Sequence, residues 1–370
     1  MEEKRFVETG KTSFFGEYLY DQVVPANHFL RKLLEGMDWR HFTEKLIKLY
    51  KGEGVVGRPP FDPALVLKME LIAYLYNLSE RQVEVYVNEN LPAKFFVGLA
   101  VDQKAPDHST LTVFRERLLK RGKLKVFEEM LADMVQIALQ QGIQFGSIQI
   151  VDSVHSIANV NTHKDDGRKK KGKEPRDPDA RWGAKHKHKV KTAEGKEEQQ
   201  TEYFFGYKTH VSLNAENGLI TSLEVTSGEV YDGHHFCGLV DRDLAQKLPV
   251  EIYAADKGYD DGNNHFYLDQ CGLYSAISLK KVRISKKNLN KQIWLEMLAT
   301  PHYQQGLSER YKIERKFGEA KQGHGFGRSR YLGRMRFAVQ AFFTAIMLNL
   351  KRIVKIMTGV GLKTQCIPAV

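Results

Sequence analysis

Apolar and polar positions alternate differently in the two parts of the chain. Up to about residue 121, apolar residues recur at helical spacing, interrupted by a glycine and three prolines in 57–63. Ser79 and Gln82 have the spacing of a capping box at the start of a helix. The expected helices cover short segments of 12–50, then 64–78, 79–89 and a stretch that begins near Asp107 or Ser109. The last three resemble a helix-turn-helix arrangement whose final helix is basic.

After residue 145 the pattern changes to short β-branched runs that are typical of buried strands. The turn at 215–217 predicts a hairpin between two of these strands. The expected strands are 147–157, 204–214, 218–228, 251–260 and 273–279, and the expected helices are 234–248, 263–271 and 337–350. Three antiparallel strands, followed by alternating helices and strands, predict a mixed α/β sheet. The apolar helix 337–350 is too short to span a bilayer, so we expect it to be buried.

Two segments interrupt this order. Residues 163–191 hold twelve Lys or Arg against five acids and almost no apolar residue, which predicts a mobile loop that contacts phosphates without reading sequence. His186 and His188 are interpreted as part of this basic run, not as a metal site. The second segment, 280–307, carries Trp294, which either packs inside the insert or stacks on a flipped base.

The expected domains follow from these boundaries. They are an N-terminal helical segment (1–58), a helix-turn-helix-like DNA-binding region (59–130), an α/β domain (145–357) interrupted by a basic loop (161–200) and an insert (280–307), and a tail (358–370).

Charge and cysteine usage narrow the function. The formal net charge is +11 and the pI about 9.3, which favours a polyanionic partner such as nucleic acid. The three cysteines are far apart, so they predict neither a disulfide framework nor a zinc site of close pairs. No signal peptide is visible at the start of the sequence, and a reducing, intracellular setting fits.

Three acids are candidates for chemistry. Asp152 lies inside the first expected strand, Asp256 ends the fourth, and Glu314 lies on a later helix. If the two strands are parallel neighbours, Asp152 and Asp256 come side by side, and a helix packed on the sheet brings Glu314 to face them. Three carboxylates without His or Cys select Mg²⁺ or Mn²⁺, and two such ions support in-line phosphoryl displacement. The alternative is structural, with Asp256 as a turn residue and Asp152 capping a local turn.

The helix that carries Glu314 has a further pattern. Arg310, Glu314 and Lys321 are spaced by four and seven residues, which puts them on nearly one face. A separate apolar stripe of Ile313, Phe317 and Ala320 can anchor the helix. Either the two cations bind phosphates beside the acid, or they form an ordinary surface ion-pair ladder with it.

These motifs together resemble a bacterial insertion-sequence transposase of the DDE type, in the group marked by a Tyr-x2-Arg-x3-Glu-x6-Lys signature. Arg310, Glu314 and Lys321 match its last three positions, while Leu307 replaces the tyrosine. Asp152 in "VDS" and Asp256 in "ADKGYD" match the strand motifs of the group, although Val154 replaces a frequent threonine. "GRPPFDP" and "PDHSTLTVFRERL" resemble its N-terminal region.

The resemblance implies a ribonuclease H-like catalytic domain in which Asp152, Asp256 and Glu314 bind two Mg²⁺ or Mn²⁺ ions. Such enzymes cut at transposon ends with water and then join the 3′ hydroxyl to target DNA. The implied partners are double-stranded DNA and a second copy of the chain on that DNA, in the bacterial cytoplasm. Two other functions are open: a metal-dependent nuclease that does not join DNA, and a DNA-binding protein that has lost catalysis.

Several further residues are candidates for DNA contact, each with a structural alternative. Arg58 either enters a minor groove or belongs to a helix-stop turn. Arg115 and Arg117 either reach DNA or form a solvated helix face. Asp232 is interpreted as a helix N-cap rather than a fourth ligand, and Asp260 and Asp261 in the same way. The remaining phosphate-binding candidates are Lys257 and the loop lysines Lys169, Lys170 and Lys171.

Overall fold

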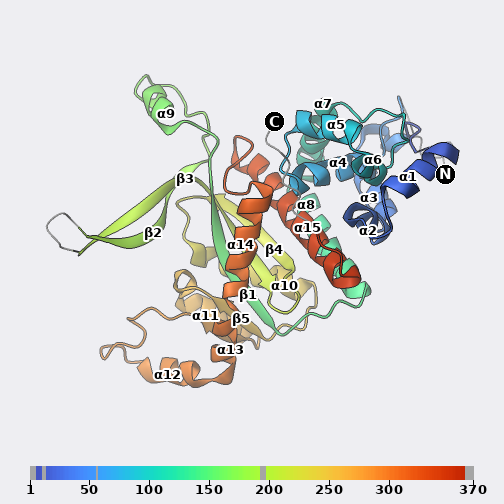
Figure 1. Ribbon diagram of the computed structural model, residues 1–370. Helices are drawn as coiled ribbons and strands as arrows, with labels where there is room; N and C mark the ends of the chain where they lie inside the picture. Colours follow the sequence, from blue (N-terminus) through green and yellow to red (C-terminus); the bar gives the residue numbers. More distant parts are fainter. Residues whose placement is uncertain (1–5, 11–13, 56, 192–196, 363–370) are drawn as a thin grey trace. The chain divides into compact units, whose positions relative to one another are not determined.

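The computed structural model describes residues 6–10, 14–55, 57–191 and 197–362 (Figure 1). They divide into two compact units. One combines the chain up to Ile143 with the segment from Phe343 onwards, and the other runs from Gln144 to Phe342.

The first unit is helical. Its N-terminal helices are α1 (Phe14–Val23), α2 (Phe29–Glu35), α3 (Trp39–Ile47), α4 (Pro63–Leu75), α5 (Glu80–Glu89), α6 (Leu91–Val97), α7 (His108–Arg117) and α8 (Lys125–Gln140). The predicted capping box is present, because Ser79 accepts from the Gln82 N–H and the Gln82 side chain accepts from the Ser79 N–H. α4 starts at Pro63 behind the N-cap Asp62 and is buried along its whole length. The sequence analysis did not predict α8.

The second unit contains one mixed sheet. Its strands are β1 (Ile148–Ile157), β2 (Arg181–Lys191), β3 (Glu197–Asn214), β4 (Ile220–Ser227), β5 (Ile252–Ala255) and β6 (Tyr274–Ile277). β1 pairs antiparallel with β3, which pairs antiparallel with β4, whereas β5 pairs parallel with β1 on one side and with β6 on the other. The strands lie in the order β4-β3-β1-β5-β6, which confirms the predicted mixed ribonuclease H-like sheet. β2 pairs with the first half of β3 and extends the sheet beyond this order.

Helices cover both faces of this sheet. Gly306 of α13 (Pro301–Glu309) lies against Ile252 and Ala254 of β5 and Ala276 of β6, so a Cβ added at this glycine would fall 2.4 Å from the Ala276 Cβ. On the opposite face, Asp243 of α10 (Phe236–Ala245) accepts from Ser212 of β3. α11 (Gly262–Gln270) also lies on this opposite face, where its His265 contacts Ser275 of β6. The side-chain alternation of each strand therefore separates an α13 face from an α10 face.

The prediction of a mobile loop over 163–191 is wrong. The segment contains α9 (Thr162–Lys169) and the strand β2, which forms a long hairpin with β3 (Figure 1). β2 pairs antiparallel with β3 from Arg181 to Lys191, and Lys185 contacts Glu202 at 2.7 Å across the hairpin. The backbone ladder with β3 thus orders a segment with few apolar residues. Residues 192–196 lie outside the described part of the chain.

The remaining helices lie in the C-terminal third. α12 (Lys291–Ala299) belongs to the predicted insert, and α14 (Tyr311–His324) follows α13 directly. α15 (Arg334–Thr358) is longer than the predicted buried helix and is long and apolar enough to cross a membrane. However, 89% of its most apolar window is buried within the protein, as expected for a core helix.

Candidate active site

Asp152 and Asp256 are brought together by two parallel strands. β1 and β5 pair in register up to Val151 and Ala255, and each acid is the next residue along its chain. Equivalent positions of parallel neighbours project to the same face of a sheet. Both carboxylates therefore lie on the α13 face, at the same level.

The Asp152 carboxyl is half-buried and fixed by its own backbone. Its Oδ1 accepts a 2.8 Å hydrogen bond from the Ser153 N–H. Burial and, to a smaller extent, the carboxylates of Asp256 and Asp232 raise the pKa of Asp152 to about 7, against the lowering effects of the Ser153 N–H and Arg310. A cation bound here would offset both the burial and the repulsion between carboxylates.

Asp256 directly follows β5 and is the N-cap of a short 3-10 turn, Lys257–Tyr259. Its Oδ1 accepts a hydrogen bond from the Gly258 N–H, and its side chain is 49% exposed. The turn interpretation of this residue is thus correct locally, yet it leaves Oδ2 directed toward Arg310, 4.0 Å away. Capping and a role in the site are compatible, because each uses a different oxygen.

Arg310 and Glu314 come from the start of α14. Arg310 stands at the junction of α13 and α14, and its buried Nε makes no hydrogen bond to a described residue. Glu314 lies one turn further on, in the first turn of α14; it is exposed and makes no hydrogen bond or ion pair within the described chain. Ile313 and Ala320 are buried, so the predicted apolar stripe anchors α14 while Phe317 is only half-buried.

The three acids have the oxygen ligands that hard divalent cations prefer, but their carboxylates do not converge on a single position. Across the residues that the structure describes, the oxygens of Asp152, Asp256 and Glu314 do not all lie within 4.8 Å of one another. Two ions spaced about 3.5–4 Å apart spread their ligands over a wider site than one ion does. A carboxylate-only donor set suits Mg²⁺ or Mn²⁺.

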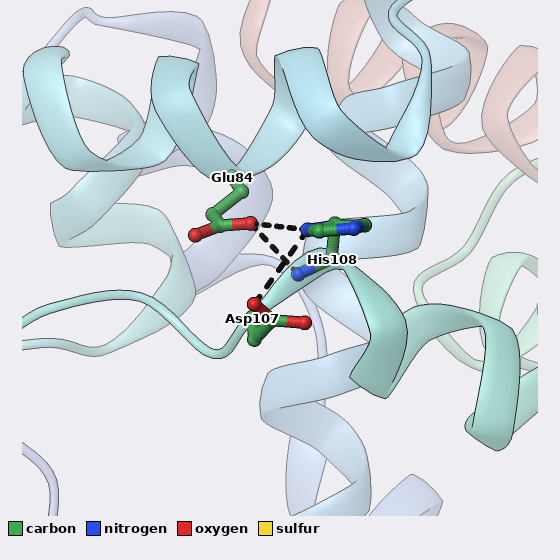
Figure 2. Close-up of side chains that lie close together, drawn as sticks. All are labelled: Glu84, Asp107 and His108. Atoms are coloured by element: carbon green, nitrogen blue, oxygen red, sulfur yellow. Dashed lines mark hydrogen bonds and ion pairs between the residues drawn. The ribbon is translucent and has the colours of Figure 1, made fainter.

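Another group of side chains does converge within 4.8 Å: Glu84, Asp107 and His108, on α5 and at the start of α7 (Figure 2). Glu84 Oε2 lies 2.8 Å from the ring Nδ1 of His108 and accepts from its backbone N–H at 2.9 Å. Asp107 caps α7 through the Ser109 N–H. These contacts join α5 to α7 and account for the cluster without a ligand.

The sequence analysis placed Asp232 wrongly. The N-cap position of its 3-10 turn is Tyr231, and the turn has no side-chain cap. Asp232 instead accepts from Lys208 Nζ at 2.9 Å and from Ser153 Oγ at 3.1 Å. No sequence signal indicated this contact, because Ser153 and Asp232 are 79 residues apart. Of the other two acids, Asp261 is the N-cap of α11, whereas Asp260 is buried against His265 and Arg283.

The prediction that Arg115 contacts DNA is wrong. Its side chain is 8% exposed and pairs with Glu70 at 2.6 Å and with Glu80. The three residues join α7 to α4 and α5 in the interior of the helical unit. Arg117 is half-buried, with its guanidinium 3.8 Å from the centre of the Tyr50 ring.

The other predicted contact residues differ in exposure. Arg58, Lys257, Lys170 and Lys171 are exposed, while the side chain of Lys169 lies outside the described residues. Trp294 is half-buried: the Arg283 guanidinium of the insert lies 4.7 Å from its ring, and the His265 ring of α11, outside the insert, lies 4.9 Å away. Trp294 therefore packs between the insert and α11.

Lys321 has a cationic neighbour that the sequence did not indicate. It lies in the last turn of α14, where burial and the nearby Lys185 of β2 lower its pKa. Lys185 is itself paired with Glu202 at 2.7 Å. Lys185 at the base of the β2–β3 hairpin and Lys321 at the end of α14 are together called the cationic patch.

The chain was compared with family models and with solved structures. A family model described as "Transposase domain (DUF772)" matches residues 18–117, and one described as "Transposase DDE domain" matches 145–350, more than half of the chain. Among solved structures, the Mos1 mariner paired end complex with Mn is 14% identical, covering 83% of this chain and 81% of that chain with a TM-score of 0.21. A pre-cleavage Mos1 transpososome is 14% identical, covering 83% and 82% with a TM-score of 0.20. Strand order and register, rather than these distant alignments, define the fold.

Proposed function

The chain belongs to the transposase DDE-domain family, and from this premise we propose that it cuts DNA at the ends of a mobile element and joins the freed ends to target DNA. The observation that carries the proposal is the pair Asp152 and Asp256 at one level of a ribonuclease H-like sheet, with Arg310 beside them. The first cut uses water, and the released 3′ hydroxyl attacks the target in the same site.

Asp152, Asp256 and Glu314 would hold two Mg²⁺ or Mn²⁺ ions. When bound, these ions activate the nucleophile and stabilise the leaving oxygen. Asp152 provides a fixed oxygen, since its other oxygen is bound to the Ser153 N–H. Glu314 is exposed and makes no hydrogen bond or ion pair among the described residues, so its carboxylate is available to a cation.

Cationic side chains around the acids would hold the DNA backbone. Arg310 carries an unused buried Nε and stands next to Asp256, where a scissile phosphate has to lie. Lys257 is the exposed neighbour of Asp256, and the patch of Lys185 and Lys321 would bind a more distant phosphate. Arg58, Arg117, Lys169, Lys170 and Lys171 remain candidates for contacts outside the catalytic centre.

Two ends of the element have to be held together for productive insertion, so we propose that the chain acts as a homodimer on DNA, in the bacterial cytoplasm. The rival functions are a metal-dependent nuclease that does not join DNA and a catalytically inactive DNA-binding protein. Neither is favoured by a specific observation here, because the nuclease uses the same acids and all three acids are present.

The test supplies the purified full-length chain with DNA that carries the sequences flanking its gene, a target plasmid, and Mg²⁺ or Mn²⁺. We expect cuts at the element's ends and insertion of pre-cut ends into the plasmid, both abolished by EDTA and by Asp152→Asn. Cutting without insertion identifies the nuclease. Binding without cutting identifies the inactive protein.

A further inference from the structure

A polar network lies directly behind the strand acids, on the α10 face of the sheet. Asp232 accepts from Ser153 Oγ at 3.1 Å through Oδ2 and from Lys208 Nζ at 2.9 Å through Oδ1. Lys208 also donates to the carbonyl of Val230 at 2.9 Å. The three side chains therefore join β1, β3 and the turn before α10.

The network is largely withdrawn from solvent, with Lys208 14% exposed and Asp232 23% exposed. A second layer supports it. His210 is fully buried, its Nδ1 lies 3.9 Å from Asp232 Oδ1, and its ring stacks on His235 with centroids 4.7 Å apart. Glu224 in turn lies 3.0 Å from His235 and 3.0 Å from Arg242. A buried charge is unfavourable unless it is paired, and here every charge has a partner.

Ser153 connects this network to the catalytic face. Successive residues of a strand point to opposite faces, so Asp152 and Ser153 share a peptide group but not a surface. The Ser153 N–H donates to Asp152 Oδ1 on one side, while its hydroxyl is bound to Asp232 on the other. Rotation of the Ser153 backbone would therefore break both contacts together.

We propose that Ser153, Asp232 and Lys208 are positioning residues, which hold the Asp152 carboxylate in the orientation required for divalent-cation binding. The inference rests on the proposed function and extends it. Asp232 is not assigned as a ligand, because its two oxygens accept from Ser153 and Lys208, whose side chains lie on the α10 face, behind the strand acids. Lys208 balances its charge, so Asp232 adds rigidity behind the site without adding a free carboxylate to it. Partners behind a metal ligand typically change metal affinity or activity by about 10–100-fold.

The test is Ser153→Ala in the full-length chain, because this change removes the anchor without altering any charge. Mn²⁺ binding is measured by titration calorimetry without DNA, and nicking of flanking DNA is measured separately. We expect Mn²⁺ affinity and nicking rate to fall by about 10-fold or more. Ser153→Thr keeps the hydroxyl and should restore both to within about threefold of wild type.

Ser156→Ala is the matched control on the same strand. Ser156 is buried and donates to the carbonyl of Phe326 at 2.6 Å, a contact that does not involve Asp232. We expect this variant to lose stability, measured by urea unfolding, yet to keep wild-type Mn²⁺ affinity.

Wild-type Mn²⁺ affinity in Ser153→Ala overturns the positioning role, and so does an equal loss of affinity in Ser156→Ala. If the wild-type chain itself neither binds Mn²⁺ nor nicks DNA, the proposed function fails, and the positioning role fails with it.

Discussion

The Nη2 atom of Arg310, at the junction of α13 and α14, lies 4.0 Å from Oδ2 of Asp256 at the end of β5. This distance is at the limit of an ion pair, and the buried Nε of Arg310 has no described partner. The guanidinium is thus held beside the acids, and the exposed part of the side chain, 21%, has hydrogen-bonding capacity that a phosphate can use.

The first prediction concerns this spare capacity. A hydrogen bond to a charged group is worth about 1.5–3 kcal/mol, so Arg310→Ala should slow nicking by about 10–150-fold in single-turnover assays. Arg310→Lys keeps the charge but not the planar fork and should be intermediate. Arg315→Ala, an exposed arginine of the same helix, is the control and should nick at the wild-type rate. Equal effects of Arg310→Ala and Arg315→Ala would exclude a specific phosphate contact.

The second prediction follows from the interior position of Arg115. Removing one partner of a buried ion pair costs about 3–5 kcal/mol, so Arg115→Met should strongly lower the free energy of unfolding, measured in urea. The physical reason is that Glu70, 1% exposed, would be left buried without its cation. Arg121→Ala, at an exposed position, should leave stability unchanged. A stable Arg115→Met protein with weakened DNA binding would instead support the original prediction of a DNA contact.

The relative position of Asp152 and Asp256 could be predicted from the sequence, because it depends only on the pairing of the two strands that precede them. Apolar β-branched runs identify β1 and β5, and a parallel pairing of these two strands brings Asp152 level with Asp256 without any further information. The face of α14 was predictable in the same way, because helical spacing alone relates Arg310, Glu314 and Lys321.

The errors share a different cause. Arg115, Asp232 and β2 are determined by partners distant in sequence, at Glu70, at Lys208 and across the β2–β3 hairpin. From sequence alone, a charged residue is predicted to lie on the surface. Its burial can be predicted only when its partner is known, because a buried charge is tolerated only in a pair. Strand formation in 181–191 likewise depends on pairing with β3 rather than on its own composition.

The third prediction concerns the cationic patch of Lys185 and Lys321. Each phosphate contact contributes about 0.9 to the slope of log affinity against log salt for duplex DNA. Lys321→Ala should lower that slope by about one, measured by fluorescence anisotropy over a salt series. Lys185→Ala should lower the slope by less, because Lys185 is also paired with Glu202. Lys355→Ala, an exposed lysine near the end of α15, should keep the wild-type slope. An unchanged slope in both patch variants would mean that no phosphate lies between these lysines.

The fourth prediction concerns the dependence of stability on pH, through Asp243 of α10. This carboxyl is 1% exposed, accepts from Ser212 Oγ at 2.6 Å and from the Tyr253 hydroxyl at 3.3 Å, and burial raises its pKa to about 6. Its ordinary value is 3.8, so the folded state holds the proton more tightly than the unfolded state does. Its contribution to stability is therefore fully present below about pH 4 and is lost as the pH rises to about 6.

Asp243→Asn removes this titration but keeps the size of the side chain. The free energy of unfolding of both proteins is measured in urea at about ten pH values from 3.5 to 8. The wild type should exceed the variant by the largest amount at the acidic end. The difference between wild type and variant should shrink up to about pH 6 and stay constant above it. Asp269→Asn, an exposed acid on α11, should show no such shrinking difference. A difference that is flat with pH would mean that Asp243 keeps an ordinary pKa, and that the Ser212 and Tyr253 hydroxyls offset its burial completely.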